Sequence, residues 1–282
     1  MDKSARGIGY FYSMNSIDFF PERIVCLTEE TTETLYLLGE QDRIVGISGF
    51  TVRPARARKE KPVVSAFIDA RIEKIISLQP DLVIGYSDLQ ADIAKQLIAH
   101  GITVWINTHH SVEGIFKMMV QLGSLVGQQE KAIALVNRIR TDLAQITEIS
   151  ETNNRKPRIY FEEWFDPLIS GIHWVSEIIE LAGGTDIFRE NRASFLAKNR
   201  IIADPQEVVN RNPDIILASW CGKKFKKDRL LARKNWEKIN AVKTDQIFEI
   251  KSSVILQPGP AAVTDGIKEI AKIIEDWQAY DQ

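Results

Sequence analysis

The sequence predicts an α/β protein built from two similar lobes that are joined by one long helix. Three observations support this fold class. Short apolar runs alternate with amphipathic segments, a helix–turn–strand pattern recurs 133 positions later, and one uninterrupted helical stretch separates the two copies. Strands that alternate with helices of this length are typical of βαβ units and of a mostly parallel sheet.

The first half of the chain alternates strand and helix signals. Apolar runs predict the strands, and amphipathic spacing that stops near Gly39 or Gly101 predicts helices. The Pro80-Asp81 pair opens a strand that is apolar throughout. The expected order is a strand at 23–27, a helix at 30–38, a strand at 43–47, a short strand at 63–64, a helix at 72–78, a strand at 82–86, a helix at 92–99 and a strand at 103–106.

Residues 128–150 predict the long helix. Apolar side chains recur there at helical spacing, and no glycine or proline interrupts them. A helix of about 20 residues is roughly 30 Å long, which is enough to cross a small domain. The polar segment 151–157 ends in Pro157 and predicts the exit from this helix.

The second half repeats the pattern of the first. Residues 73–84 (EKIISLQPDLVI) match residues 206–217 (QEVVNRNPDIIL), and both predict a helix, a Pro-Asp turn and a buried strand. The other elements expected here are a strand at 158–161, a helix at 175–181, a strand at 246–250 and a closing helix at 260–277.

These patterns divide the chain into an N-terminal α/β lobe at 14–126, a linking helix at 127–155 and a C-terminal α/β lobe at 156–282. A continuous helix between lobes permits less closure than strand hinges do, so we expect the lobes to keep a nearly fixed arrangement.

Composition excludes several classes of protein. The net charge of −2 argues against a nucleic-acid-binding or membrane-surface protein. Two cysteines, Cys26 and Cys221, cannot form a disulfide-dense scaffold or a four-thiolate zinc site. No run of about 18 uncharged apolar residues predicts a membrane span. Gly7-Ile8-Gly9 lacks the strand, third glycine and helix of a dinucleotide fingerprint, and the sequence has no P-loop.

The N-terminus raises the question of location. Residues 1–20 contain no apolar run of the length that a signal peptide needs. If the chain is the complete product, this predicts a cytoplasmic protein. Otherwise residues 1–13 stand in place of an export signal, with Met14 as a second start. Cys26 is not expected to carry a lipid, because it lies in a predicted strand and follows Arg23-Ile24-Val25, which lacks small residues.

Residues just after the predicted strands are the first candidates for a binding site, because open parallel sheets bind ligands beyond the carboxyl ends of their strands. Aromatic side chains recur at these exits, together with a few polar groups. This mixture suits a large apolar ligand with a polar rim, although each ring also fits core packing. The candidates are Phe50, Phe67, Ser87, Glu163, Trp164, Trp174 and Trp220.

Catalysis and metal binding have little support. His109-His110 are adjacent and therefore point in different directions, and no HxxxH or HxH spacing accompanies them. Cys221 would need a base such as His173 to act as a nucleophile. We therefore predict neither catalytic residues nor metal ligands, and no enzymatic activity or cofactor.

Charged residues form two further patterns. One basic loop spans residues 53–61 and another spans residues 223–229, and both follow predicted strand exits, where they would favour an anionic ligand or remain solvated. Glu73 and the Gln206-Glu207 pair begin equivalent helices in the two lobes. They fit simple helix-terminus electrostatics or the docking of a two-fold symmetric partner with paired arginines.

Several segments together resemble a family of transport proteins. They are RIVCLTEETTETLYLLG, DRIVGISGF, VVSAFIDARIEKIISLQPDLVIGYSDLQADIAKQL, YFEEWFDPLISGIHWVSEIIELAGGTDIF and VVNRNPDIILASWCGKK. They resemble the helix-linked (class III) substrate-binding proteins of ABC importers for iron–siderophores, haem and vitamin B12, and within this class they are most similar to cobalamin-binding proteins. The resemblance covers about residues 22–277.

The resemblance implies two Rossmann-like lobes of the periplasmic-binding-protein type, with the ligand between them. It places Phe50, Phe67, Glu163, Trp164, Trp174 and Trp220 near the ligand, and it places transporter-docking carboxylates on Glu73 and on Gln206 or Glu207. Two departures from the family pattern stand out. Alignment on Pro213 puts Gln206 rather than Glu207 at the second docking position, and Val52-Arg53-Pro54 replaces the frequent Asp-Tyr-Pro.

The function expected from the resemblance is that of a monomeric, extracytoplasmic binding protein. It would capture a corrinoid and deliver it to a dimeric membrane permease. The alternatives are a haem- or ferric-siderophore-binding protein of the same fold, and a cytoplasmic sensor or enzyme that reuses the fold.

Overall fold

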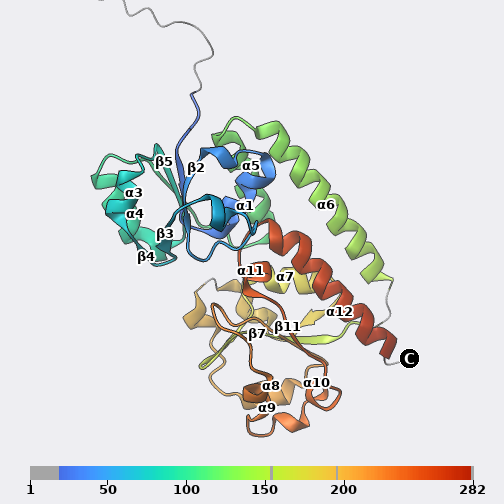
Figure 1. Ribbon diagram of the computed structural model, residues 1–282. Coiled ribbons are helices and arrows are strands. Elements are labelled where there is room, and N and C mark those ends of the chain that lie inside the picture. Colours follow the sequence, from blue (N-terminus) through green and yellow to red (C-terminus); the bar gives the residue numbers. More distant parts are fainter. Residues whose placement is uncertain (1–18, 153–154, 195, 281–282) are drawn as a thin grey trace, which may run out of the picture.

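The computed structural model describes residues 19–152, 155–194 and 196–280 (Figure 1). The expectations for residues 1–13 and Met14 therefore lie outside the described residues. Two sheets form two α/β lobes, and the long helix α6 (Gln129–Glu151) runs along one side of the molecule from the upper lobe towards the lower one. The two-lobed α/β fold predicted from the sequence is confirmed.

The N-terminal lobe contains a six-stranded sheet in the order β4-β3-β2-β1-β5-β6. Its pairings are parallel except that β3 and β4 are antiparallel. The helices α1 and α5 pack on one face of this sheet, and α3 and α4 pack on the other. The strands are β1 (Ile24–Cys26), β2 (Ile44–Ser48), β3 (Val63–Ala66), β4 (Asp69–Ala70), β5 (Leu82–Tyr86) and β6 (Val104–Asn107), and the helices are α1 (Glu29–Leu38), α2 (Ala57–Glu60), α3 (Ile72–Ser77), α4 (Ala91–Ala99) and α5 (Val112–Leu125).

The C-terminal lobe contains a five-stranded sheet in the order β11-β10-β7-β8, and β9 also pairs with β7. The helices α7 and α12 cover one face, whereas α8, α9 and α10 pack with the other. The strands are β7 (Arg158–Phe165), β8 (Leu168–Ser170), β9 (Thr185–Asp186), β10 (Ile215–Ala218) and β11 (Ile247–Glu249), and the helices are α7 (His173–Leu181), α8 (Gln206–Arg211), α9 (Lys227–Leu231), α10 (Asn240–Lys243), α11 (Ser252–Ile255) and α12 (Ile267–Tyr280), which follows a π-helical turn at Ala262–Gly266.

One hydrophobic core extends through both lobes. Ile84 on β5, Ile139 on α6 and Ile159 on β7 belong to the same cluster of buried side chains. The cluster also includes apolar residues of α5, α7 and α12. The linking helix therefore packs as part of the core rather than as a free tether.

The internal repeat extends to backbone detail. Gln79 and Asn212, which lie 133 positions apart, both adopt positive φ values, of 47° and 44°. In each lobe the aspartate two residues further on accepts a hydrogen bond from the backbone N–H at the start of the central strand. Asp81 binds Arg23 N at 3.1 Å, and Asp214 binds Arg158 N at 2.9 Å. The same local solution thus connects helix and strand in both lobes.

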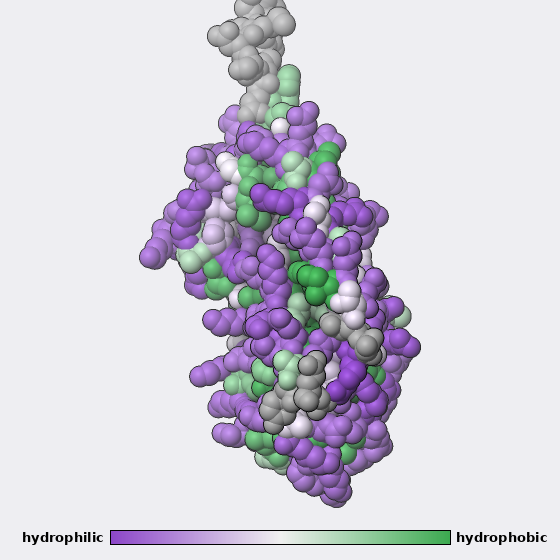
Figure 2. All heavy atoms as spheres, turned by 90° about the vertical axis from the view of Figure 1, so that its right-hand side faces the viewer, coloured by the Kyte–Doolittle hydropathy of each residue, from purple (hydrophilic) through white to green (hydrophobic). Residues whose placement is uncertain are grey.

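The face that carries α6 and α12 is mostly polar (Figure 2). Hydrophobic residues appear there in small separate patches, which is ordinary for a folded domain surface. Among the described residues, no helix combines the length and the apolar character needed to cross a membrane.

Candidate functional site

The two lobes meet where the N-terminal strands end. The Glu33 carboxylate on α1 accepts a hydrogen bond from Ala261 N at 3.2 Å. Burial lowers the pKa of His109, just after β6, to about 4, so its ring is neutral at pH 7 and donates from Nε2 to Pro258 O at 2.7 Å. Both contacts join the carboxyl edge of the first sheet to the segment before α12, so the two lobes touch at this edge.

A glycine permits this close approach. A Cβ atom on Gly259 would lie 2.3 Å from Glu30 Cβ and 3.0 Å from Glu30 Cα. Because the second of these atoms belongs to the backbone, a side chain at position 259 would force the lobes apart. Glu30 is only 1% exposed at this contact.

Two consecutive glutamates, Glu29 and Glu30, follow β1 and open α1 next to the contact between the lobes. Glu30 accepts a hydrogen bond from Thr28 Oγ1 at 2.6 Å, whereas the buried Oε2 atom of Glu29 has no partner. Burial raises the pKa of Glu29 to about 8 and that of Glu30 to about 7. Desolvation disfavours the charged form of a carboxyl group, so Glu29 is mostly neutral at pH 7.

The C-terminal lobe also has two consecutive glutamates at the cleft end of its central strand, but both are ion-paired. Glu162 is fully buried and receives two bonds from Arg233, at 2.5 and 3.0 Å, and one from Trp220 Nε1 at 2.9 Å. Glu163 is bound in the same bidentate way by the buried Arg200, at 2.6 and 3.0 Å. Glu163 was predicted to meet the ligand, and both of its oxygens already have a protein donor.

Cys221, which follows β10, is influenced electrostatically by carboxyl groups of both lobes. Desolvation and the nearby carboxyl groups of Glu163 and Glu29 raise the pKa of its thiol. The effect of Glu29 on this pKa indicates that the end of β10 lies within electrostatic range of the end of β1. The ends of these two strands, one from each lobe, are therefore near each other.

Gln90 holds two of the predicted ligand residues in place. Its Nε2 donates to Phe67 O at 2.7 Å, and its Oε1 accepts from Tyr86 N at 2.8 Å, next to Ser87. Phe67 and Ser87 both have positive φ values, of 51° and 62°. Gly85 leaves room for this amide, because a Cβ there would lie 2.5 Å from Gln90 Oε1.

Aromatic side chains form a continuous row in the C-terminal lobe. Ring centroids lie 5.0 Å apart for Trp164 and Phe165, 4.5 Å for Phe165 and Trp220, and 5.1 Å for Trp220 and Phe225. Trp164 is half-buried, but Trp220 is only 3% exposed. Trp164 thus ends the row at the surface, and Trp220 lies behind it.

The other predicted aromatics divide between surface and core. Phe50 is 48% exposed after β2, and Phe67 is half-buried after β3. Trp174 is 2% exposed, belongs to the hydrophobic core and donates from Nε1 to Ile255 O at 2.9 Å. Of the two roles that the sequence left open for Trp174, core packing is the one that its burial supports, because α7 turns this ring inward towards α11.

Several cations of the two basic loops are engaged by neighbouring residues. Arg53 bonds Glu33 at 2.9 Å and Asp265 at 2.6 Å, so it links the lobes. Lys223 lies 5.0 Å from the centroid of the Trp164 ring, and Lys227 pairs with Asp245. These contacts reduce the attraction that the loops would otherwise exert on an anionic ligand.

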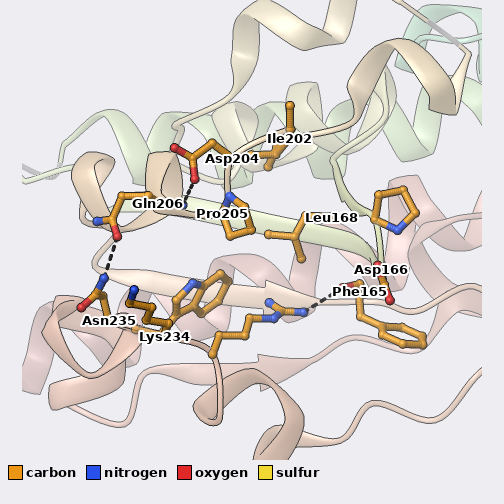
Figure 3. Close-up of a pocket in the computed structure, with 13 residues that line it drawn as sticks. Phe165, Asp166, Leu168, Ile202, Asp204, Pro205, Gln206, Lys234 and Asn235 are labelled. Atoms are coloured by element: carbon orange, nitrogen blue, oxygen red, sulfur yellow. Dashed lines mark hydrogen bonds between the residues drawn. The ribbon is translucent and has the colours of Figure 1, made fainter.

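The predicted docking residues lie on α3 and α8. Glu73 is exposed on α3. Glu207 forms an ion pair with Arg211 one turn along α8, and Gln206 accepts a hydrogen bond from Asn235 at 2.9 Å. Gln206 also lines a cavity of about 600 Å³ whose lining residues all belong to the C-terminal lobe (Figure 3). Gln206 is therefore less free than Glu73 to meet a partner.

Histidine and cysteine side chains do not assemble a metal site among the described residues. Tyr86 OH donates to His109 O at 2.7 Å, and desolvation also lowers the pKa of His110. His173 lies 3.4 Å from Glu177, its partner one turn along α7. Cys26 is buried within β1, and burial raises the pKa of its thiol to about 12.

Sequence reasoning missed Glu29, Glu30 and Gln90 as cleft residues. The Glu-Glu pair directly after the first strand was the available signal, because two adjacent carboxylates at a strand exit are unusual for a buried position. Gln90 gave no such signal, because its contacts with Tyr86 N and Phe67 O depend on the direction of its side chain in the folded protein.

The comparisons with known proteins agree with the fold. The model of the periplasmic binding protein family matches residues 24–254. The chain is 29% identical over 268 residues to an uncharacterized ABC transporter substrate-binding lipoprotein, YvrC, of Bacillus subtilis, with 90% of this chain and 80% of the relative covered. It is 29% identical over 203 residues to a vitamin B12-binding protein of Vibrio campbellii, with 70% of each covered.

Among solved structures, the periplasmic heme-binding protein RhuT from Roseiflexus is similar with a TM-score of 0.76 and 21% identity, over 90% of this chain and 99% of that chain. At this identity the likeness shows the fold alone. The family match, by contrast, spans most of the chain and both sheets. The chain therefore belongs to the periplasmic binding protein family, as a solute-binding protein of the ABC-importer type.

Proposed function

We propose that this protein captures a corrinoid, a ligand of the vitamin B12 type, in the cleft between its lobes and delivers it to the permease of an ABC importer. The observation that supports the proposal is that partly exposed aromatic rings follow or end strands of both sheets, where we expect the cleft. Phe50 and Phe67 follow strands of the first sheet, and Trp164 ends the aromatic row of the second. Such rings cover the apolar faces of a macrocycle.

Arginines that are already paired with carboxylates of the protein favour a corrinoid over haem or a ferric siderophore as the ligand. Haem carries propionates, and many siderophore complexes are anionic. Arg53, Arg200 and Arg233 are all paired with carboxylates of the protein. A corrinoid presents neutral amides instead, which do not need a free cation.

An enzymatic or sensing role has less support. The raised pKa of the Cys221 thiol is the opposite of what activates a cysteine nucleophile. The relatives described above are named as a substrate-binding lipoprotein and as a vitamin B12-binding protein. In the proposed role, Glu73 on α3 and the Gln206-Glu207 pair on α8 dock the permease, one contact for each lobe.

The test is calorimetry with cyanocobalamin on the wild-type chain and on Trp164→Ala. We expect the wild-type chain to bind at micromolar concentrations and the variant to lose about tenfold in affinity, because the stacking of one aromatic ring contributes on the order of 1–1.5 kcal/mol. Phe19→Ala, which removes an exposed ring before β1, is the matched control and keeps full affinity. No heat of binding with the wild-type chain contradicts the corrinoid assignment.

A further inference from the structure

Buried polar atoms without partners gather at the carboxyl ends of the strands. Besides Glu29 Oε2 after β1, they include Thr51 Oγ1 after β2, Ser65 Oγ in β3 and Ser219 Oγ after β10. Each of these residues is at most 6% exposed. Buried polar groups are normally hydrogen-bonded, so unpartnered groups at one edge of both sheets point to a ligand or to solvent that completes them.

Glu29 differs from the others in chemistry. A hydroxyl can donate or accept, but a carboxylate only accepts, and its charge needs a partner when it is buried. The other buried glutamates at the strand ends have donors: Thr28 for Glu30, and arginines for Glu162 and Glu163. Glu29 is thus the carboxyl group of the cleft whose buried oxygen is left for an incoming donor.

We propose that Glu29 is a recognition residue of the cleft, and that it selects ligands that present N–H donors or positive charge over ligands that present carboxylates. This inference rests on the proposed function, since it names the polar chemistry that the corrinoid must offer. A corrinoid whose ring carries amide side chains presents the N–H donors that Glu29 requires. A macrocycle with carboxylates in the same positions does not, because it offers no N–H donor and brings like charge to Glu29 once that group is ionised.

The charged groups around Glu29 set how this selection varies with pH. Glu30 and Glu33 on α1 raise its pKa after burial, and Arg58 and Arg53 lower it. Cys221 faces it from the second lobe. With its pKa raised to about 8, Glu29 gains its charge between pH 7 and pH 9. Rejection of carboxylate ligands therefore strengthens over this range, while those ligands keep a constant charge.

The experiment compares two corrinoids on the full chain, by quenching of tryptophan fluorescence at pH 7 and pH 9. Dicyanocobinamide carries amide side chains, and dicyanocobyrinic acid carries carboxylates on the same ring. For the wild-type protein we expect cobinamide to bind at least about tenfold more tightly than the acid at pH 9, where Glu29 is ionised, since one hydrogen bond to a charged group is of this size. At pH 7, where Glu29 is mostly protonated, we expect a smaller preference.

Two variants of Glu29 and a control complete the test. At pH 9, Glu29→Leu is expected to lower cobinamide affinity about tenfold, and to bring the affinity of the acid to within about threefold of that of the amide. Glu29→Gln keeps an acceptor, so it retains most of the cobinamide affinity and loses the widening of the preference between pH 7 and pH 9. Glu148→Gln, an exposed change on α6, behaves as the wild type does.

The outcomes separate this inference from the proposed function. If the wild-type chain binds neither corrinoid, the proposed function fails. If it binds cobinamide, and Glu29→Leu binds both ligands as the wild type does, the function stands and the role of Glu29 is overturned. Circular dichroism and thermal melting of each variant establish that a loss of affinity is not a loss of fold.

Discussion

Each lobe has two consecutive glutamates at the cleft end of its central strand, and the surroundings of the two pairs differ. Glu162 and Glu163 on β7 are each held by a bidentate arginine. Glu29 and Glu30 after β1 have no arginine within hydrogen-bonding distance, and burial raises the pKa of both. The C-terminal pair is therefore structural in character, and the N-terminal pair keeps the capacity to bind something else.

This contrast between the two pairs shows that a carboxylate at the end of a strand does not by itself indicate a ligand site. A buried charge is compatible with stability when its partner comes from the protein, and it points to function when that partner is missing. Three changes, given in order of decreasing effect, test this contrast.

The largest effect is expected from Arg233→Met. The variant leaves Glu162 fully buried without its counter-charge, and breaking such a pair costs about 3–5 kcal/mol. Urea denaturation monitored by circular dichroism measures the loss. The double variant Arg233→Met with Glu162→Gln should recover part of it, because the unpaired charge is then gone. A single variant as stable as the wild type would show that Glu162 is not held as described.

A smaller effect of opposite sign is expected from Glu29→Gln. Glu29 has a pKa of about 8 in the folded chain and about 4.5 when unfolded, so the folded state binds the extra proton between these values. Its contribution to stability is present below pH 4.5 and is lost as the pH rises through 8. The variant should therefore melt at a higher temperature than the wild type at pH 8.5, by about 2–4 °C for each kcal/mol gained in the free energy of unfolding. The increase in melting temperature should be smaller at pH 5.

Thermal melts of Glu29→Gln and Glu148→Gln side by side at the two pH values make this measurement. Glu148 is exposed on α6 and serves as the matched control, with no pH-dependent difference from the wild type expected. An equal gain for Glu29→Gln at both pH values would mean that burial does not hold the proton on Glu29.

The smallest effect is expected from Asp265→Asn. This change breaks the ion pair between Arg53 and Asp265, which joins the lobes but is partly solvated. Exposed ion pairs are worth about 0–1 kcal/mol and weaken with salt. Melting of the variant in low and high salt is the measurement, and a loss as large as that of Arg233→Met would remove the distinction between buried and exposed pairs.

The sequence predicted most of the fold because the repeated units carry strong local signals. The strands at β1, β2, β5, β6 and β10 and the long helix α6 lie where the apolar patterns placed them. The short strands β8 and β9 were not predicted. Each has only two or three residues and gains its hydrogen bonds from β7, so nothing in its own sequence marks it.

The site was predicted less well than the fold, for a physical reason. Placement after a strand selected Phe50, Phe67 and Trp164, whose rings are partly exposed, and their contact with a ligand stays a prediction. Whether a ring faces the cleft or the core depends on how a helix packs, as the burial of Trp174 against Ile255 O shows. The unpaired state of Glu29 depends likewise on which arginines reach which carboxylates across the fold. Such information is distributed over distant positions and is not visible in one segment.

The continuous core through both lobes has a consequence for how the chain is made. Ile267, Ile270 and Ile274 on α12 belong to the same buried cluster as Ile24 on β1. During synthesis the N-terminal half emerges well before these residues, so part of its apolar surface stays uncovered until the last helix leaves the ribosome. The two lobes should then become stable together in one cooperative step, rather than fold independently one after the other.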